Sequence, residues 1–347
     1  MELKKILKKA VFLDPFNSFN PGGRECEIRT DPLTGRNTRI LFFPIRVIPE
    51  LDIEKLKANI EELIKRDPGF CPFCPDNIEK ITPKFNPDLF TKERYKVGEA
   101  VCFPNVFPYD ENGAVTVISK KHLVTSDEFT EDMLKDSFSC CVDYLTDVDS
   151  KQPEAIYQSI NWNYLPAAGS SIIHPHLQVT ASAIPTNYCT DILKTIELSD
   201  KNIFTDLVNT EISNEERFIV KEKYFSWMIG FAPEGIFDLI AISHEYFEPK
   251  DLKDNRLDEL IKNILKSIHF IRSYNILSFN LSLFFILRNE RFIPHMRICP
   301  RTNVPPLETS EINYMKMLHN EPMTTLKPEL VAEQLKNVWN YLLTEAV

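Results

Sequence analysis

The five residues His174-Pro175-His176-Leu177-Gln178 constrain this chain most, because they place two histidines and a glutamine at alternate positions. In an extended strand, residues two apart project to the same face. We therefore expect one strand surface to carry two imidazoles and a carboxamide. One ring of such a set can attack a phosphoanhydride while the amide binds the phosphoryl oxygens. The alternative, a polar strand face with chance histidines, is disfavoured, since two of only seven histidines fall here, beside the Gly169-Ser170-Ser171 turn.

The composition is that of an ordinary folded protein. Of 347 residues, 43% are hydrophobic and 26% are charged, which allows a sizeable core and argues against disorder. The net charge of −10 argues against nucleic acid or an anionic membrane as a partner. A phosphorylated ligand would therefore depend on local backbone N–H groups and a few placed cations.

No segment has the pattern of a membrane span or a signal peptide. No apolar run approaches the ~20 residues that a membrane helix needs. The N-terminus lacks an uninterrupted hydrophobic core and a small-residue cleavage site. We expect a cytoplasmic protein whose eight cysteines are thiols or metal ligands, with no disulfides.

Hydrophobic periodicity predicts a similar order of strands and helices in both halves of the chain. In the first half it predicts strands over 38–46, 98–103, 114–119, 154–163 and 174–183, and helices over 52–66 and 131–147. In the second half it predicts strands over 217–230, 236–243, 278–287 and 292–299, and helices over 255–273 and 328–344. A polar, helix-prone linker lies within 186–213.

Short sequence echoes support an internal repeat. Val117-Ile118-Ser119 precedes His122 as Ala241-Ile242-Ser243 precedes His244, and residues 176–179 resemble residues 295–298. We interpret these echoes as a degenerate duplication of an α+β unit, with coincidence between two generic runs as the alternative. The two halves would span residues 1–190 and 210–347.

Cys71 and Cys74 form a Cys-x-x-Cys pair, which can present two thiolates to one ion. A structural zinc site needs four ligands, and the chain has no second pair of this kind. His122 follows the end of a predicted strand, and His174 begins the strand predicted over 174–183. Together with Cys71 and Cys74, these two histidines would make a closed Cys₂His₂ site. A redox or idle cysteine pair is the alternative, but a thioredoxin-like setting is missing. One structural zinc ion per subunit would leave His176 free for chemistry.

Attack by His176 also requires a neutral ring with an available lone pair. The reference pKa of a histidine, about 6.5, allows the neutral form at neutral pH. A backbone carbonyl at one ring nitrogen would fix the tautomer and expose the lone pair of the other nitrogen.

Five stretches occur in a specific combination across the first half. They are DPLTGR at 31–36, CPFC at 71–74, FPNVFP at 103–108, ISKKH at 118–122, and the run from Asn163 through GSSIIHPHLQ at 169–178. Together they resemble the galactose-1-phosphate uridylyltransferase (GalT) family of the histidine-triad superfamily. The resemblance implies an α+β fold of two degenerate histidine-triad-like repeats, with largely antiparallel sheets flanked by helices, and a homodimer.

The resemblance also implies residue roles. His176 would be the nucleophile that accepts a nucleotidyl group from a nucleotide sugar, and Gln178 would hydrogen-bond the phosphoryl oxygen. The phosphate path would comprise Asn163, Gly169, Ser170 and Ser171. The nucleoside pocket would comprise Phe103, Asn105, Phe107 and Val115, although simple core packing is the alternative for Phe103, Phe107 and Val115. Arg46 would reach a phosphate across the dimer interface.

The chain departs from the family pattern in its second half. His295 remains where some members bind a second metal, but Arg297 replaces its partner, so we expect no second metal. Met317 and Met323 stand at the best-aligning positions for the family's sugar-binding Glu and Gln. The resemblance therefore leaves the identity of the sugar open.

Three functions compete. The first is a nucleotidyltransferase of the UDP-glucose–hexose-1-phosphate uridylyltransferase kind, which moves a nucleoside monophosphate to a sugar 1-phosphate. The second is a nucleotide-sugar or dinucleoside-polyphosphate phosphorylase, which performs the same covalent step with inorganic phosphate as acceptor. Hydrolytic members of the superfamily carry a third histidine in place of Gln178, so both of these are favoured over hydrolysis. The third is a zinc-braced nucleotide-binding module without turnover.

Overall fold

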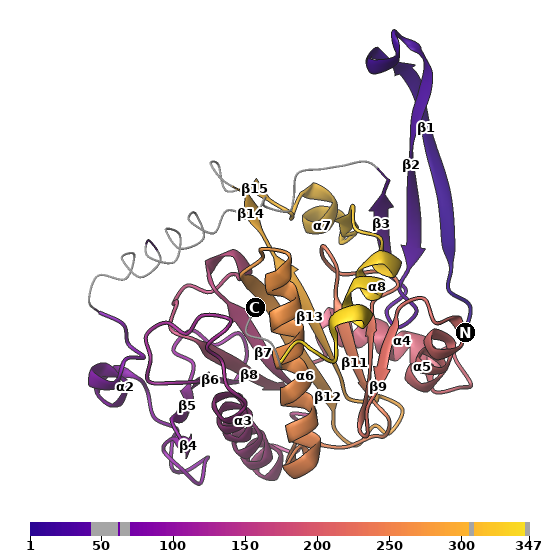
Figure 1. The fold of residues 1–347 in the computed structure, drawn as a ribbon. Coiled ribbons are helices and arrows are strands. Elements are labelled where there is room, and N and C mark those ends of the chain that lie inside the picture. The colour runs from indigo at the N-terminus through magenta and orange to yellow at the C-terminus, as the bar shows by residue number, and fades with distance from the viewer. Residues whose placement is uncertain (43–61, 63–69, 305–308, 344–347) are drawn as a thin grey trace.

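A ten-stranded sheet forms the centre of the protein (Figure 1). The computed structural model describes residues 1–42, 62, 70–304 and 309–343. The strand order is β4-β5-β6-β8-β7-β12-β13-β11-β10-β9, and every neighbouring pair is antiparallel. The expected α+β fold with largely antiparallel sheets is confirmed. Within these ranges, every helix is too short or too polar to be a transmembrane span.

The first half of the chain supplies five adjacent strands of this sheet, β4-β5-β6-β8-β7, and the helix α3 that packs on them. In chain order its elements are α2 (Pro75–Ile81), β4 (Tyr95–Val97), β5 (Ala100–Pro104), β6 (Asn112–Val117), α3 (Glu131–Lys151), β7 (Tyr157–Tyr164), the short helix η2 (Pro166–Ala168) and β8 (His176–Ser182). The Thr130 hydroxyl caps α3 by accepting from the Met133 N–H at 3.3 Å, so the helix begins at the residue that the sequence predicts. Because β8 begins at His176, His174 lies just before the strand that was predicted to contain it.

The second half repeats the strand order of the first: from the centre of the sheet outward, the strands run β7-β8-β6-β5-β4 in one half and β12-β13-β11-β10-β9 in the other. It contains β9 (Phe218–Lys221), β10 (Phe225–Ile229), β11 (Leu239–Ser243), the short helix η3 (Pro249–Asp251), α6 (Asp254–Ser273), β12 (Ser278–Ile286) and β13 (His295–Arg301). The single strand predicted over 217–230 is wrong, since a turn divides it into β9 and β10. The two halves meet where β7 pairs with β12 from Tyr157↔Ile286 to Tyr164↔Phe279. The domain limits at residues 190 and 210 stay a prediction.

The two faces of β8 have different surroundings. Leu177, Val179 and Ala181 belong to the large core under α3 and α6, which lie side by side on one face of the sheet (Figure 1). His176 and Gln178 alternate with these residues and therefore face the other side. Core packing thus fixes the register that presents the candidate active residues.

The predicted linker forms two helices, α4 (Asn187–Glu197) and α5 (Ile203–Asn214). Thr186 and Asn202 cap them by accepting from backbone N–H groups. Their apolar residues join a second core cluster with Ile240 of β11 and Ile286 of β12. The linker is therefore part of the folded body.

The N-terminal segment, for which the sequence analysis predicted no structure, forms a long hairpin of β1 (Lys5–Asp14) and β2 (Asn20–Thr30) around η1 (Pro15–Asn17). The hairpin projects away from the body (Figure 1), and nine of the ten β1 residues are exposed. It has no buried face, so it lacks the alternating pattern that marks a strand in sequence.

The remaining elements of the described chain lie at the base of the hairpin and near the C-terminus. They are β3 (Asn37–Leu41), β14 (Asn303–Val304), β15 (Thr309–Ser310), α7 (Tyr314–His319), β16 (Met323–Thr324) and α8 (Pro328–Val338). The strand predicted over 38–46 is described only as β3. Apart from Glu62, the helix predicted over 52–66 lies outside the described residues.

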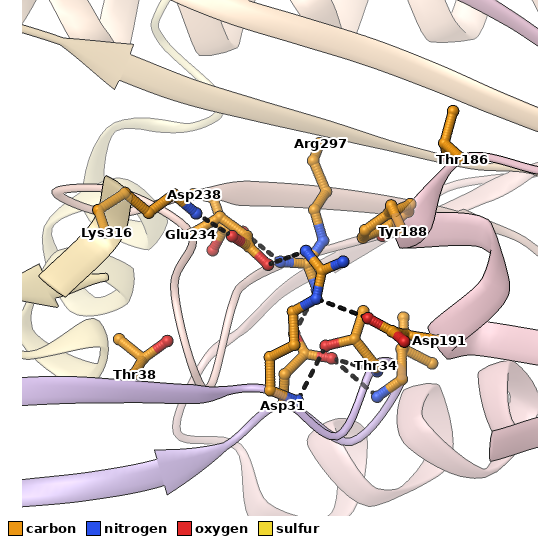
Figure 2. A network of polar contacts seen from close by, with 12 residues as sticks. Asp31, Thr34, Thr38, Thr186, Tyr188, Asp191, Glu234, Asp238, Arg297 and Lys316 are labelled. Carbon is orange, nitrogen blue, oxygen red and sulfur yellow. Dashed lines mark hydrogen bonds and ion pairs between the residues drawn. The ribbon is translucent and has the colours of Figure 1, made fainter. Parts of the chain in front are cut away.

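A buried ion-pair network ties the DPLTGR motif to the second half (Figure 2). The Arg297 guanidinium lies between Asp31, which accepts from Nη2, and Asp238, which accepts from Nη1 at 2.8 Å. Asp31 also closes its own turn by accepting from the N–H groups of Leu33 and Thr34, at 2.8 and 2.9 Å. Burial acts to raise the pKa of Asp31, but Arg297 outweighs it and holds that pKa below its usual value.

Replacing Arg297 with Leu is expected to destabilise the fold by about 3–5 kcal/mol, because it leaves two buried carboxylates without their cation. Urea unfolding measures this loss. Arg288→Leu is the matched control, since Arg288 pairs with Asp149 at 2.7 Å but keeps 47% of its side chain exposed. An exposed pair of this kind contributes about 0–1 kcal/mol. Equal losses in both variants would contradict the role given to Arg297.

Candidate active site and metal centre

Cys71, Cys74, His122 and His174 converge on one point. Their ligand atoms all lie within 4.8 Å of one another. The Cys74 Sγ lies 3.3 Å from the His122 Nδ1 and 3.7 Å from the His174 Nδ1, and the Cys71 Sγ lies 3.6 Å from the latter. In a tetrahedral zinc site, bond lengths of about 2.3 Å to sulfur and 2.0–2.1 Å to nitrogen put S and N about 3.6 Å apart. The predicted four residues therefore fit a closed zinc site.

The orientation of the His174 ring supports a ligand role. Its Nε2 lies 2.7 Å from the carbonyl oxygen of Ser119. A carbonyl can only accept, so Nε2 carries the proton and the Nδ1 lone pair faces the thiols. Metal-binding histidines commonly have such a second hydrogen bond. His174 is fully buried, and its ring cannot reorient without losing this contact.

His176 has the tautomer that nucleophilic attack requires. Its Nδ1 lies 2.8 Å from the carbonyl oxygen of His174 and donates to it. This leaves the Nε2 lone pair available, and the described residues provide no hydrogen-bond partner for Nε2. Burial lowers the pKa of His176, with the backbone hydrogen bond acting in the opposite direction, so the ring is neutral at neutral pH.

Phe73 holds the two rings on one side of the chain. Its ring centroid lies 6.1 Å from that of His174 and 5.1 Å from that of His176, both in edge-on contact. Phe73 also packs against Phe103 at 5.7 Å. Phe73 was not among the predicted site residues, although its place between Cys71 and Cys74 was a usable signal.

Gln178 and the two asparagines of β7 lie on the same face as His176. Gln178 pairs with Asn161 of β7 and with Val115 of β6. Directly opposed residues in antiparallel strands share a face, and so do residues two apart in one strand. Asn163 therefore lies on the face that carries His176. His176 and Gln178 thus share one strand surface as expected, whereas His174 lies before the strand.

The residues expected in the nucleoside pocket have different surroundings. Phe103 and Val115 are buried in a small cluster with Phe73, next to His176. Phe107 is 81% exposed. The Asn105 carboxamide oxygen accepts from the Phe107 N–H at 3.0 Å and shapes this loop. Core packing accounts for Phe103 and Val115 but not for Phe107.

The residues of the expected phosphate path surround a tight turn before β8. Gly169 has φ +88, which favours glycine, and nothing lies within 4 Å of the position of a Cβ. The Ser170 hydroxyl donates to the Ile172 carbonyl at 2.7 Å, whereas Ser171 is exposed. Asn163 accepts from Asn280 of the second half at 2.7 Å. Arg46 lies outside the described residues.

His295 of β13 reproduces the local geometry of His176. Its Nδ1 lies 3.0 Å from the carbonyl of Ile293, two residues back, and a proline intervenes in both cases. Its Nε2, however, lies 3.0 Å from the Tyr188 hydroxyl, and the ring is fully buried. Burial lowers the pKa of His295 to about 3. This second histidine is sealed from solvent.

Comparisons with known proteins give one relative in sequence and several in structure. No protein-family model matches the chain. An uncharacterized protein of Archaeoglobus fulgidus is 31% identical over 322 residues, which cover 91% of this chain and 93% of that protein. The chain belongs to the same family as this protein.

The solved structures identify the fold. An ADP-glucose phosphorylase from Arabidopsis thaliana with bound ADP-glucose has a TM-score of 0.67 at 16% identity, over 90% of this chain and 99% of that chain. A uridylyltransferase has a TM-score of 0.63 at 14% identity, over 91% and 99% of the two chains. The chain has the GalT fold. The resemblance inferred from the sequence motifs is thereby confirmed for the fold, and the GalT fold places its two halves in one continuous sheet.

Replacing Cys71 with Ser is expected to remove most of the bound zinc and to lower the thermal midpoint, because the four-ligand set is broken. Elemental analysis of the purified protein and thermal unfolding measure both effects. Cys26→Ser is the matched control, since Cys26 lies on β2, outside the cluster. Unchanged zinc per chain in Cys71→Ser would exclude the site.

Proposed function

We propose that this protein transfers a nucleoside monophosphate from a nucleotide sugar to a phosphorylated acceptor, through a covalent nucleotidyl intermediate on His176. The observation that carries the proposal is the donation from His176 Nδ1 to the His174 carbonyl at 2.8 Å. It leaves a neutral imidazole whose Nε2 lone pair is the attacking group. The GalT fold and the neighbouring Gln178 are consistent with this chemistry.

The reaction proceeds in two displacements. His176 Nε2 attacks the α-phosphorus, the P–N bond forms, and the bond to the sugar phosphate breaks with its electron pair leaving on oxygen. A phosphate oxygen of the acceptor then attacks the same phosphorus and releases the neutral ring. Gln178 can donate to the phosphoryl oxygen in both steps without supplying a proton. Ping-pong kinetics follow from this sequence.

The zinc ion would be a structural brace held by Cys71, Cys74, His122 and His174. With four protein ligands, such a site has no coordination position for substrate. Such a site would fix the position of His174, and the His174 carbonyl orients the ring of His176.

The expected substrate contacts remain part of the proposal. Asn163 and the turn at Gly169, Ser170 and Ser171 would bind phosphoryl oxygens, since turn N–H groups form concave anion sites. Phe103, Val115, Asn105 and Phe107 would surround the nucleoside, and Phe107 has the exposed surface to cover it. Arg46 would add a cation from the partner subunit of a homodimer.

A nucleotide-sugar phosphorylase is the second candidate, because the structural neighbour with bound ADP-glucose is a phosphorylase. It shares the first displacement and differs in its acceptor. UDP-glucose and ADP-glucose as donors, each with inorganic phosphate or a hexose 1-phosphate as acceptor, separate the two functions. Turnover of the donor with inorganic phosphate as acceptor, but not with a hexose 1-phosphate, would identify a phosphorylase. Turnover with a hexose 1-phosphate would identify a transferase.

Matched substitutions of the two similar histidines test the nucleophile. His176→Asn is expected to abolish the nucleotidyl adduct and to lower turnover by at least about a thousandfold. His295→Asn is expected to keep both, because His295 is sealed by Tyr188. Asn retains a donor near the Nδ1 position in each variant. Intact-protein mass after mixing with donor alone detects the adduct, and its absence from the wild type would favour a non-catalytic binding module.

The projecting hairpin supports the proposed homodimer. Near its tip, Val11, Phe16 and Phe19 are 72%, 93% and 67% exposed. A two-stranded hairpin is only marginally stable alone in water, and a contiguous exposed apolar surface commonly marks an interface.

Light scattering after size exclusion is therefore expected to give a dimer for the wild type. The double variant Phe16→Asp, Phe19→Asp should shift the protein toward the monomer. Leu198→Asp, at an equally exposed position beyond α4, is the control and should stay dimeric. A wild-type monomer would contradict the dimer.

A further inference from the structure

A chain of side-chain contacts crosses from the second half of the protein to Asn163. Asn280 of β12 lies directly opposite Asn163 of β7, and its Nδ2 lies 2.7 Å from the Asn163 Oδ1. The same Nδ2 lies 2.8 Å from the carbonyl of Ala168, the residue before Gly169. The Asn280 Oδ1 lies 2.7 Å from Nη1 of Arg301 on β13. Glu311 accepts from Nε of Arg301.

The donors and acceptors of this chain can be assigned without ambiguity. A guanidinium has only donors, so the Asn280 atom facing Arg301 must be its oxygen. The Asn280 NH₂ group then points the other way and can donate both hydrogens, one to Asn163 and one to the Ala168 carbonyl. Because Asn163 uses its oxygen as the acceptor, its own NH₂ group is left to face outward from this contact.

This orientation matters on the face that carries His176. An asparagine that can rotate about its last bond presents a donor or an acceptor to a ligand, and an acceptor would repel phosphoryl oxygens. Donation from Asn280 to the Asn163 oxygen fixes the orientation of the Asn163 amide. It also holds the Ala168 carbonyl, which orients the peptide leading into the Gly169 turn.

We propose that Asn280 and Arg301 are positioning residues that make Asn163 a fixed hydrogen-bond donor toward the phosphoryl group of the substrate. This inference rests on the proposed function and assigns the second half a part in the reaction. Neither residue needs to contact the reacting atoms, since both act through the amide of Asn163 and the turn before Gly169.

General structural packing is the competing explanation for these contacts. Asn163 and Asn280 are both only partly buried, and the Arg301 side chain is 19% exposed. Groups at such positions could hydrogen-bond to water, so the fold does not require this connected set. The three residues also come from strands on the two sides of the β7–β12 junction.

The test is Asn280→Asp, which keeps an acceptor oxygen for Arg301 but cannot donate to Asn163 or to Ala168. With UDP-glucose or ADP-glucose as the donor, we expect adduct formation on His176 to slow by about ten- to a hundredfold. The thermal midpoint should stay close to that of Asn209→Asp, a charge-matched change at an exposed position on α5. Wild-type adduct formation in Asn280→Asp would overturn the inference and leave the proposed function intact.

A double-mutant cycle separates positioning from packing. If Asn280 acts through Asn163, the Asn280→Asp change should cost far less in an Asn163→Ala background than in the wild type. Additive losses would assign Asn280 a packing role and overturn the inference. Arg301→Met gives a second variant, with a smaller expected loss because Asn280 can still donate in one of its two orientations. No adduct in the wild type with either donor would instead overturn the proposed function itself.

Discussion

The pairing of β7 with β12 is the constraint on which the rest of the structure depends. It joins two five-stranded halves into one sheet and sets Asn163 opposite Asn280. One core under α3 and α6 then spans both halves, and packing of that core fixes which side of β8 carries His176. The face of the sheet that carries His176 and Asn163 therefore continues onto β12, which carries Asn280.

His176 and His295 have the same local backbone contact but different surroundings. His176 and His295 each donate from Nδ1 to a carbonyl two residues back, across a proline. The difference lies in what surrounds Nε2. Tyr188, from the linker helix α4, occupies that position beside His295, and the buried Arg297 guanidinium lies over the Tyr188 ring, 5.7 Å from its centroid. Helix α4 thus supplies a hydrogen-bond partner for Nε2 of His295, whereas no such partner lies beside Nε2 of His176 in the described part of the chain.

The sequence predicted the parts of the structure that depend on local pattern. The predicted helices over 255–273 and 131–147 start within one residue of α6 and at the first residue of α3. The four candidate zinc ligands do converge: the Cys-x-x-Cys spacing is local, and the pairing of β6 with β8 brings together the segments that carry His122 and His174. The hairpin β1–β2 was missed because it buries no face. The Asn163–Asn280 contact was missed because it joins residues 117 positions apart, and its existence depends on the order of strands in the sheet.

His174 belongs to two systems at once. Its side chain faces the thiols of the Cys-x-x-Cys pair, while its main-chain oxygen holds the ring of His176. A disturbance of the Cys/His cluster would therefore reach the proposed nucleophile through a single amino acid. Loss of turnover on chelation would be the signature of a mechanical linkage and would not by itself indicate Lewis-acid catalysis.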